Sequence, residues 1–220
     1  MIKHVFIDFN GTLLDDVNLC NDLLNKMLKN QNKELVDIKR YKEIFKFPVK
    51  DYYVDAGIDF NVESFESLAE KFMSEYVIEY KKCSLYSGII DTIDFLKSKG
   101  INLYILSASK QSILDEQCEY FNLTKHFDKI IGIKTIYANS KEDVAIEFIN
   151  SSNINKSEAI FVGDTLHDFE VAKTVGINCV LVESGHQSHN VLKAANTTIL
   201  KDLNELKEKF DEIFNWWIIW

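Results

Sequence analysis

The chain is poor in the residues that most constrain or break a backbone. Pro48 is its single proline, and eight glycines are spread over 220 residues. This composition excludes collagen-like and proline-rich low-complexity chains. Arginine is equally scarce, because Arg40 is the single arginine and the other basic residues among the 25 are lysines. Any bound phosphate group must therefore be held mainly by lysine, a metal ion or backbone amides rather than by paired arginines.

Cysteines and long apolar runs are also sparse. Cys20, Cys83, Cys118 and Cys179 lie too far apart in the sequence to match the ligand spacing of a zinc site. Scattered thiols indicate a reducing compartment, and no apolar stretch is long enough to span a bilayer. The first residues lead straight into a strand pattern, without the features of a signal peptide. We therefore expect a cytoplasmic protein that binds no membrane and is a monomer or a weak homodimer.

The charge balance limits the partners. Acidic residues outnumber basic ones by 34 to 25, which gives a net charge of -9. This excess argues against general nucleic-acid binding, because a polyanion would be repelled. Hydrophobic residues make up 46% of the chain, which is enough to build a buried core. A phosphorylated ligand would then depend on cations placed locally at its site.

The most informative stretch is residues 5–16. It opens with the apolar run Val5-Phe6-Ile7, which favours a buried strand, and Asp8 follows at the end of that run. A buried carboxylate is costly unless a charge or a metal meets it, and ligand sites of open parallel sheets gather at the carboxyl ends of strands. Taken alone, Asp8 is either a functional carboxylate or a strand-end residue that hydrogen-bonds the following backbone.

Three further strand ends carry polar residues of complementary chemistry. Residues 161–168 read Phe-Val-Gly-Asp-Thr-Leu-His-Asp, so a strand and a glycine lead to Asp164 and Asp168. The apolar run 103–106 ends at Ser107, and Lys141 opens a helical pattern shortly after the apolar run 130–133. A carboxylate, a hydroxyl, a lysine and an acidic pair therefore occur in this order.

This ordered set resembles the haloacid dehalogenase-like (HAD) superfamily of hydrolases, in particular its phosphoglycolate phosphatase-like branch. The family pattern Asp-x-Asp-Gly-Thr reads Asp-Phe-Asn-Gly-Thr at residues 8–12, and Gly-Asp-x-x-x-Asp matches residues 163–168. Ser107 matches the second motif and Lys141 the third, with Lys134 as the competing lysine. The resemblance covers roughly residues 1–200 and implies a Mg²⁺-dependent phosphatase that acts on a small phosphorylated metabolite.

The resemblance also implies a role for each matching residue. Asp8 would be the nucleophile that forms an aspartyl-phosphate. The implied metal ligands are Asp8, the backbone carbonyl of Asn10, Asp164 and Asp168, and the implied catalytic residues are Asp8, Asn10, Ser107 and Lys141. The implied phosphate-binding residues are Thr12, Ser107, Ala108 and Lys141. From its position alone, Asp168 either ligates through water, holds Lys141, or complements a helix dipole.

The alternation of strand and helix patterns predicts the fold class. It is α/β, a doubly wound parallel sheet of the Rossmann-like kind, with strands near 5–7, 101–106, 130–133, 159–162, 179–182 and 198–200. Helical patterns alone fill the stretch between the first two strands. We expect a core domain of residues 1–15 and 86–220 and, as the resemblance implies, a helical cap domain of residues 16–85.

Asn10 departs from the family, in which most phosphatases carry Asp at this position. That Asp protonates the leaving oxygen and then activates water, and an amide does neither at neutral pH. Three interpretations stay open: the substrate needs no proton at its leaving group, the enzyme is slow, or the chain is a non-catalytic phosphometabolite sensor or regulatory partner. A phosphosugar mutase is a further alternative, ranked lower because it depends more strongly on that acid.

Two segments outside the motifs carry weaker expectations. Residues 47–53, with Lys46 and Lys50 nearby, either face the substrate pocket or pack as an ordinary helix and turn. From Asp202 onward the apolar spacing predicts one amphipathic helix. Trp216 to Trp220 add more apolar surface than one helix face buries, so we expect this end to occupy a groove or a second subunit.

Overall fold

The computed structural model describes residues 1–133 and 140–215. Six parallel strands form one sheet in the order β5-β4-β1-β6-β7-β8. Their bounds are β1 His4–Ile7, β4 Asn102–Lys110, β5 Lys129–Ile133, β6 Ala159–Gly163, β7 Asn178–Val182 and β8 Thr198–Leu200. The strand order reverses beside β1, which is where open α/β sheets place their ligand sites. The predicted α/β class with a doubly wound parallel sheet is confirmed.

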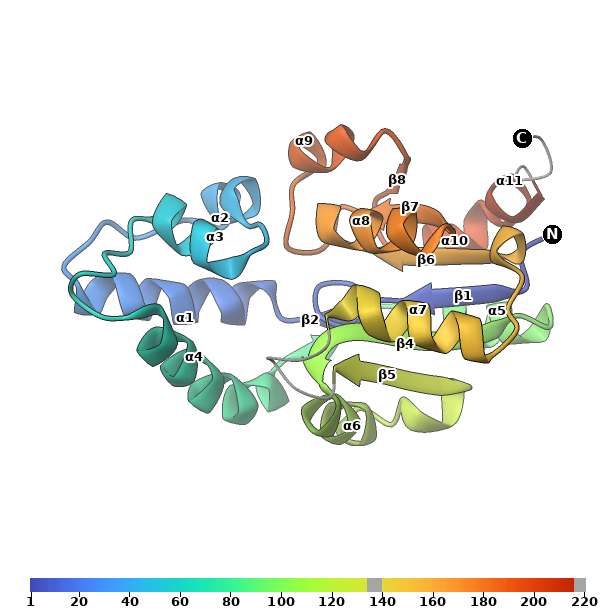
Figure 1. Ribbon diagram of the computed structural model, residues 1–220, viewed down its shortest axis with the longest axis horizontal. Coiled ribbons are helices and arrows are strands. Elements are labelled where there is room, and N and C mark those ends of the chain that lie inside the picture. Colours follow the sequence, from blue (N-terminus) through green and yellow to red (C-terminus); the bar gives the residue numbers. More distant parts are fainter. Residues whose placement is uncertain (134–139, 216–220) are drawn as a thin grey trace.

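Helices cover both faces of this sheet, as Figure 1 shows. The alternation along β1 explains this, because Val5 and Ile7 belong to one buried cluster and Phe6 to the other. Helices α7 and α8 pack on the Phe6 face, and α5 and α6 pack on the opposite face. Their bounds are α5 Ile89–Ser98, α6 Gln111–Tyr120, α7 Lys141–Ser151 and α8 Leu166–Val175, with the short α9 at His189–Leu192.

A group of helices stands apart from the sheet, at the left of Figure 1. It lies between β2 (Leu14–Asp15) and β3 (Ser84–Leu85), which pair antiparallel where the chain leaves and re-enters the core. These helices are α1 Val17–Asn30, α2 Ile38–Ile44, α3 Val49–Ala56 and α4 Phe65–Glu79. They share a separate hydrophobic cluster that includes Leu24, Tyr41 and Leu68. The pairing of β2 with β3 was not predicted, since two-residue strands give no detectable alternation.

Helix α3 shows how local sequence sets these elements. It begins directly after Pro48, whose ring suits the start of a helix but not its interior, and it ends at Gly57 with a positive φ of 104°. Lys46 pairs with Asp55, and Lys50 lies over the ring of Phe60. The segment of residues 47–53 thus begins a regular helix with its lysines engaged beside it, and Phe47, Val49, Tyr52 and Tyr53 line the cavity described below.

The C-terminal prediction was wrong in one respect. Instead of one helix from Asp202, the described residues form α10 (Glu205–Glu208) and α11 (Phe210–Asn215), separated at Lys209. Leu206, Ile213 and Phe214 are nonetheless buried against the sheet, as the apolar spacing indicated. Trp216 to Trp220 lie outside the described residues, so the prediction for this end stays untested. Within residues 1–133 and 140–215, no helix is long and apolar enough to cross a membrane.

Single-turn 3-10 helices complete the described chain. They lie at Tyr80–Lys82, Thr124–His126, Lys156–Glu158 and Lys193–Ala195. Strand β4 is longer than the predicted strand, because it continues past a change in register to Lys110. Ser107, Ala108 and Ser109 therefore lie within the extended end of β4 rather than in a loop. This extension carries them along the edge of the sheet where β1 and β6 end.

Candidate active site

Carboxylates from two neighbouring strands meet at the carboxyl edge of the sheet. Asp8 follows β1, and Asp164 and Asp168 follow β6, which pairs with β1. One carboxylate oxygen of each of the three lies within 4.8 Å of the others, and all three side chains are buried. The structure thus brings together the three acidic residues that the motifs singled out.

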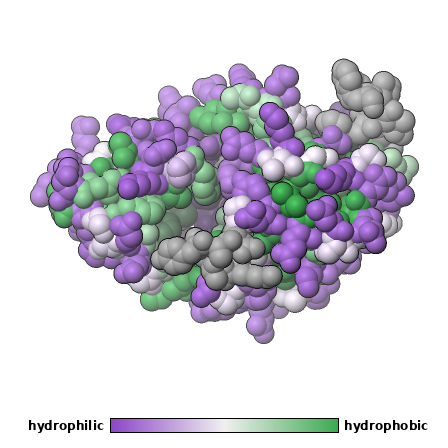
Figure 2. Space-filling view, viewed as in Figure 1, coloured by the Kyte–Doolittle hydropathy of each residue, from purple (hydrophilic) through white to green (hydrophobic). Residues whose placement is uncertain are grey.

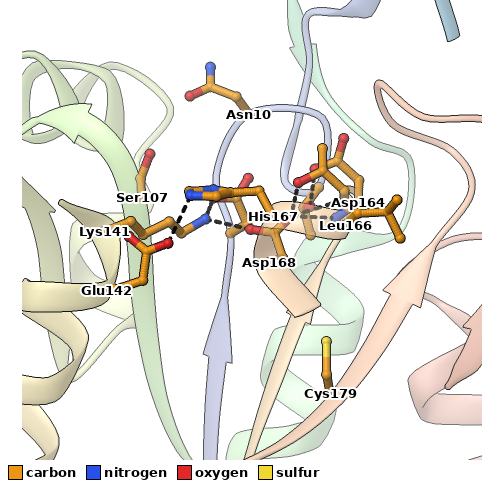
Figure 3. Close-up of polar contacts among 12 residues, drawn as sticks. Asn10, Ser107, Lys141, Glu142, Asp164, Leu166, His167, Asp168 and Cys179 are labelled. Atoms are coloured by element: carbon orange, nitrogen blue, oxygen red, sulfur yellow. Dashed lines mark hydrogen bonds and ion pairs between the residues drawn. The ribbon is translucent and has the colours of Figure 1, made fainter. Parts of the chain in front are cut away.

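Lys141 inserts between two of these carboxylates. It is the first residue of α7, whose start is fixed by a capping box between Ser140 and Asp143. Its Nζ forms an ion pair with Asp8 and a second one, of 2.6 Å, with Asp168. Figure 3 shows Lys141 reaching across to Asp168. The competing candidate Lys134 lies outside the described residues.

Asp168 organises the loop as well as the lysine. Its Oδ1 accepts from Lys141, and its Oδ2 accepts from the backbone amides of Asp164 and Thr165 and from the Thr165 hydroxyl. Gly163 makes this approach feasible, because an added Cβ there would lie 2.3 Å from the Asp168 carboxyl carbon. The Asp168 side chain therefore fixes both the turn after β6 and the position of Lys141.

The electrostatic balance of this cluster favours a cation. Burial raises the pKa of Asp8, and the carboxylates of Asp168 and Asp164 raise it further, against the opposing effect of Lys141. Burial also raises the pKa of Asp164, to about 6. For Asp168 burial acts in the same direction, but Lys141 outweighs it and the pKa falls below its usual value. Lys141 pairs with Asp8 and Asp168, and the His186 that lies near Asp164 is itself paired with Asp16, so a divalent cation would restore the balance.

Thr12 contacts the carboxylate cluster. Its hydroxyl donates to Oδ1 of Asp164 at 3.0 Å and is buried, so its one hydrogen is engaged there rather than free for a phosphoryl oxygen. Ser107 is also buried, and its Oγ accepts from the backbone amide of Ser109 at 3.1 Å. Its hydroxyl hydrogen is not used in that bond. Ser107 and Ala108 both line the cavity that contains Asp8.

Asn10 lies in a hydrogen-bond network that the sequence did not reveal. Its Nδ2 donates to Oδ2 of Asp16 at 2.8 Å and to the hydroxyl of Tyr76 at 2.5 Å, and its Oδ1 accepts from Ser109 at 3.1 Å. The Tyr76 hydroxyl in turn donates to Asp16 at 2.7 Å. The amide is therefore engaged on both its nitrogen and its oxygen.

Asp16 is the centre of that network. It directly precedes α1, but its carboxylate makes no capping hydrogen bond to that helix. Instead it accepts from the amide of Gly11 at 3.0 Å and pairs with Nε2 of His186 at 3.2 Å. Burial opposes its ionisation, but His186 outweighs burial, so the pKa of Asp16 is lowered. These contacts follow from burial, because a buried carboxylate needs several donors.

His186 was also missed from the sequence. It lies in the loop after β7 and is buried, with Nδ1 hydrogen-bonded to the Tyr41 hydroxyl at 2.8 Å and its backbone amide donating to Asp164 at 2.6 Å. Burial lowers its pKa, but the charge of Asp16 outweighs burial, so the net shift is upward. The available signal was its position, since it follows a predicted strand at the same edge as Asp164.

A cavity of about 480 Å³ opens in front of these groups, between the sheet and helices α2 to α4. Asp8, Ser107, Lys141 and Asp164 line its inner end. Figure 2 shows a hollow on this face with hydrophobic residues beside it. His167 lines the cavity too, where it stacks on Phe47 with ring centroids 4.6 Å apart. Its Nε2 pairs with Glu142 rather than with the carboxylate cluster, so His167 is a residue of the cavity wall.

Comparisons with known proteins agree with this arrangement. A phosphoglycolate phosphatase of Pseudomonas fluorescens is 26% identical over 212 residues, which cover 92% of this chain and 77% of that protein. Phosphoglycolate phosphatase 1 of Pseudomonas aeruginosa is 23% identical, with the same coverage. The crystal structure of a predicted phosphatase from Clostridium acetobutylicum superposes with a TM-score of 0.80 at 23% identity, covering 96% of this chain and 99% of that one.

The family assignment rests on a match between this chain and the sequence model of a protein family. The model described as haloacid dehalogenase-like hydrolase matches residues 5–182, which span the strands from β1 to β7 and all four motifs. The family predicted from the ordered motifs is thereby confirmed. This chain belongs to the haloacid dehalogenase-like hydrolase family.

Proposed function

We propose that the protein is a Mg²⁺-dependent phosphatase that hydrolyses a small phosphorylated metabolite through an aspartyl-phosphate on Asp8. The observation that carries this proposal is the buried cluster of Asp8, Asp164 and Asp168 around Lys141 at the inner end of the cavity. A nucleophile, a lysine and two further carboxylates at one cavity end are suited to phosphoryl transfer. The names of the relatives support the same reaction class.

The reaction has two displacements. In the first, a carboxylate oxygen of Asp8 attacks phosphorus, and the bond from phosphorus to the leaving oxygen breaks. In the second, water attacks the same phosphorus, which releases phosphate and restores the Asp8 carboxylate. Lys141 opposes the upward shift of the Asp8 pKa and balances charge on the phosphoryl oxygens, and the Ser107 hydroxyl and the Ala108 amide donate hydrogen bonds to them. Asp168 acts mainly by holding Lys141.

The residues present fit a magnesium ion. Carboxylate and carbonyl oxygens are the ligands that Mg²⁺ prefers, and the donor set is anionic beyond the charge of Lys141. Asp8, Asp164 and the backbone carbonyl of Asn10 would hold the ion directly, with Asp168 contributing through water. When bound, the ion supplies positive charge that offsets repulsion between Asp8 and the phosphate dianion. Gly11 keeps the site open, because a Cβ there would lie 2.3 Å from Oδ2 of Asp164.

The helical segment of residues 16–85 would act as the cap. Helices α2 to α4 supply one wall of the cavity, and the chain passes between core and helices at the β2–β3 pair. Hydrogen bonds from Tyr41 to His186 and from Gln187 to Phe45 also link the two parts. Movement about that pair would admit substrate and then exclude water from the aspartyl-phosphate. This division assigns residues 1–15 and 86–220 to the core domain.

Asn10 supports a second candidate, a non-catalytic phosphometabolite sensor. Its amide cannot titrate and is engaged with Asp16, Tyr76 and Ser109, so the structure offers no carboxyl at this position. Such a protein would bind phosphate esters without turnover. A phosphosugar mutase is disfavoured further, because it needs a proton-transfer group here twice in each cycle.

Phosphate release distinguishes the phosphatase from the sensor. Wild type, Asp8→Asn and the control Asp22→Asn, which changes an exposed acid on α1, are assayed with a set of phosphate esters. Each assay is run with Mg²⁺ and with a chelator. We expect Mg²⁺-dependent release by wild type and Asp22→Asn and none by Asp8→Asn. Equal release by Asp8→Asn would contradict the proposed nucleophile, and tight binding of esters without release would favour the sensor.

A further inference from the structure

The wall of the active-site cavity that lies opposite the carboxylates is apolar and aromatic. Helices α2 to α4 and their connections direct Phe45, Phe47, Tyr52, Phe72 and Met73 into it. Met73 and Phe47 are 40% and 39% exposed, which is unusual for such large apolar side chains. The cavity continues directly to Asp8, so the group that meets this wall is the part of the substrate that phosphorus leaves behind.

The cations that line the same cavity are mostly engaged. Lys141 pairs with Asp8 and Asp168, while His186 pairs with Asp16 and His167 with Glu142. No cationic residue of α2 to α4 is among the described residues that line it. Lys110 remains, but it is exposed at the end of β4, where water screens its charge. A second anionic group on the substrate, such as a carboxylate, would therefore face an apolar wall.

Asn10 points to the same substrate class by a separate route. An amide cannot give a proton to the leaving oxygen, and alkoxides, which are far more basic than phenolates, need that proton most. A phenol has a pKa of about 10, whereas water has one of about 15.7. An aryloxide therefore departs without help, and its ring is the group that an aromatic wall recognises.

From these two features we infer that the enzyme is built for phosphate monoesters with an apolar aromatic leaving group, rather than for phosphoglycolate or another ester that carries a carboxylate. This inference rests on the proposed phosphatase function and names its substrate class. The phosphoryl group would lie against Asp8 and Lys141, and the ring would pack between Phe47, Phe72 and Met73. The volume of about 480 Å³ lies within the range of small-molecule sites.

The test uses two non-hydrolysable phosphonates, so that it does not depend on turnover. Benzylphosphonate has the shape of phenyl phosphate, and 3-phosphonopropionate has the shape of phosphoglycolate, with carbon in place of the ester oxygen in each. Binding of both is measured by calorimetry with Mg²⁺ present. We expect benzylphosphonate to bind wild type at least about tenfold more tightly. A smaller ratio, or a preference for 3-phosphonopropionate, would overturn the inference.

Two variants locate the preference on the apolar wall. Met73→Lys places a cation on the cavity side of α4, and Ile78→Lys places the same cation on α4 at a 65% exposed position that does not line the cavity. We expect Met73→Lys to lower the benzylphosphonate preference by about tenfold or more and Ile78→Lys to leave it unchanged. Equal ratios in the two variants would overturn the assignment of the wall.

Hydrolysis of phenyl phosphate and phosphoglycolate, measured alongside binding, separates the two claims. If neither ester is hydrolysed but the preference for benzylphosphonate is intact, the proposed phosphatase function is contradicted. The preference of the site for aromatic ligands is then supported. Phosphate release that favours phosphoglycolate supports the phosphatase and contradicts the substrate class.

Discussion

Replacing Asn10 by aspartate tests the network around Asp16 most sharply. The amide nitrogen of Asn10 lies 2.8 Å from Oδ2 of Asp16, which is buried. Asn10→Asp changes the volume little but replaces a donor with a second carboxylate at hydrogen-bond distance. The Tyr76 hydroxyl and the ring of His186 also face Asp16, and both are already hydrogen-bonded to it. The Ser109 hydroxyl, which donates to Oδ1 of Asn10 at 3.1 Å, is then the one donor of this network that is not already bonded to Asp16.

The size of the effect follows from the distance. Two unit charges about 4 Å apart repel by about 4 kcal/mol at an effective dielectric constant of about 20. The ion pair with His186 offsets part of this repulsion, so we expect Asn10→Asp to lose about 2–4 kcal/mol of unfolding free energy where both carboxylates are ionised. The pair avoids the repulsion by keeping one proton, which raises one folded-state pKa.

The pH dependence has a definite sign. A carboxyl whose folded pKa lies above its unfolded value of about 3.9 loses stability as the pH rises through the folded value. The deficit of Asn10→Asp relative to wild type is therefore small near pH 4 and grows toward pH 8. Urea unfolding of both proteins across this range measures it. The double variant Asn10→Asp with Asp16→Asn keeps one carboxylate and is expected to recover most of the loss.

Two results would refute this reasoning. A deficit that is the same at both ends of the pH range would show that no like-charge pair forms. A double variant no more stable than Asn10→Asp would show that Asp16 is not its partner. Because Asn-Gly sequences deamidate readily, peptide mass analysis of the wild type around residue 10 accompanies each measurement.

Three further predictions concern Asp164, Lys141 and the chemical role of residue 10. Asp164→Ala is expected to weaken Mg²⁺ binding, measured by calorimetry, while the fold persists by circular dichroism; unchanged affinity would place the metal elsewhere. Lys141→Met is expected to cost about 3–5 kcal/mol of unfolding free energy at neutral pH without metal, because it leaves buried carboxylates unpaired. That deficit is expected to shrink in acid, since Asp168 has a lowered folded pKa and its ion pair is lost as the pH falls through it. Asn10→Asp is expected to speed hydrolysis of alkyl phosphates by ~10²-fold and of aryl phosphates by less, so an unchanged alkyl-to-aryl ratio would remove residue 10 from the acid position.

The sheet and its polar edge were predictable because they rest on local patterns. Apolar runs mark β1, β4 and β6, and parallel strands necessarily bring the residues at their carboxyl ends together. Asp8, Asp164 and Lys141 were found in this way. The lengths of the strands and helices were harder to predict. Strand β4 extends to Lys110, and the predicted C-terminal helix is interrupted at Lys209. Both depend on tertiary contacts that a single stretch of sequence does not express.

The network around Asp16 was not predictable for the same reason. Asp16, Tyr76 and His186 come from α1, α4 and the loop after β7, and no motif or periodicity links positions so far apart. Each has an ordinary local interpretation, as a helix-start acid, a core aromatic and a loop histidine. Their shared burial at the mouth of the site becomes visible once the helical segment is docked on the core.

The central claim is that Asp8 becomes phosphorylated during turnover. Wild type is mixed with phenyl phosphate and Mg²⁺, quenched in acid within the first turnovers, and digested for peptide mass analysis. We expect one added phosphoryl group on the peptide that contains Asp8, which disappears when the quench is delayed until substrate is exhausted and never forms in Asp8→Asn. Phosphate release by wild type with no phosphorylated Asp8 at any quench time, or with the phosphoryl group on another residue, would contradict it.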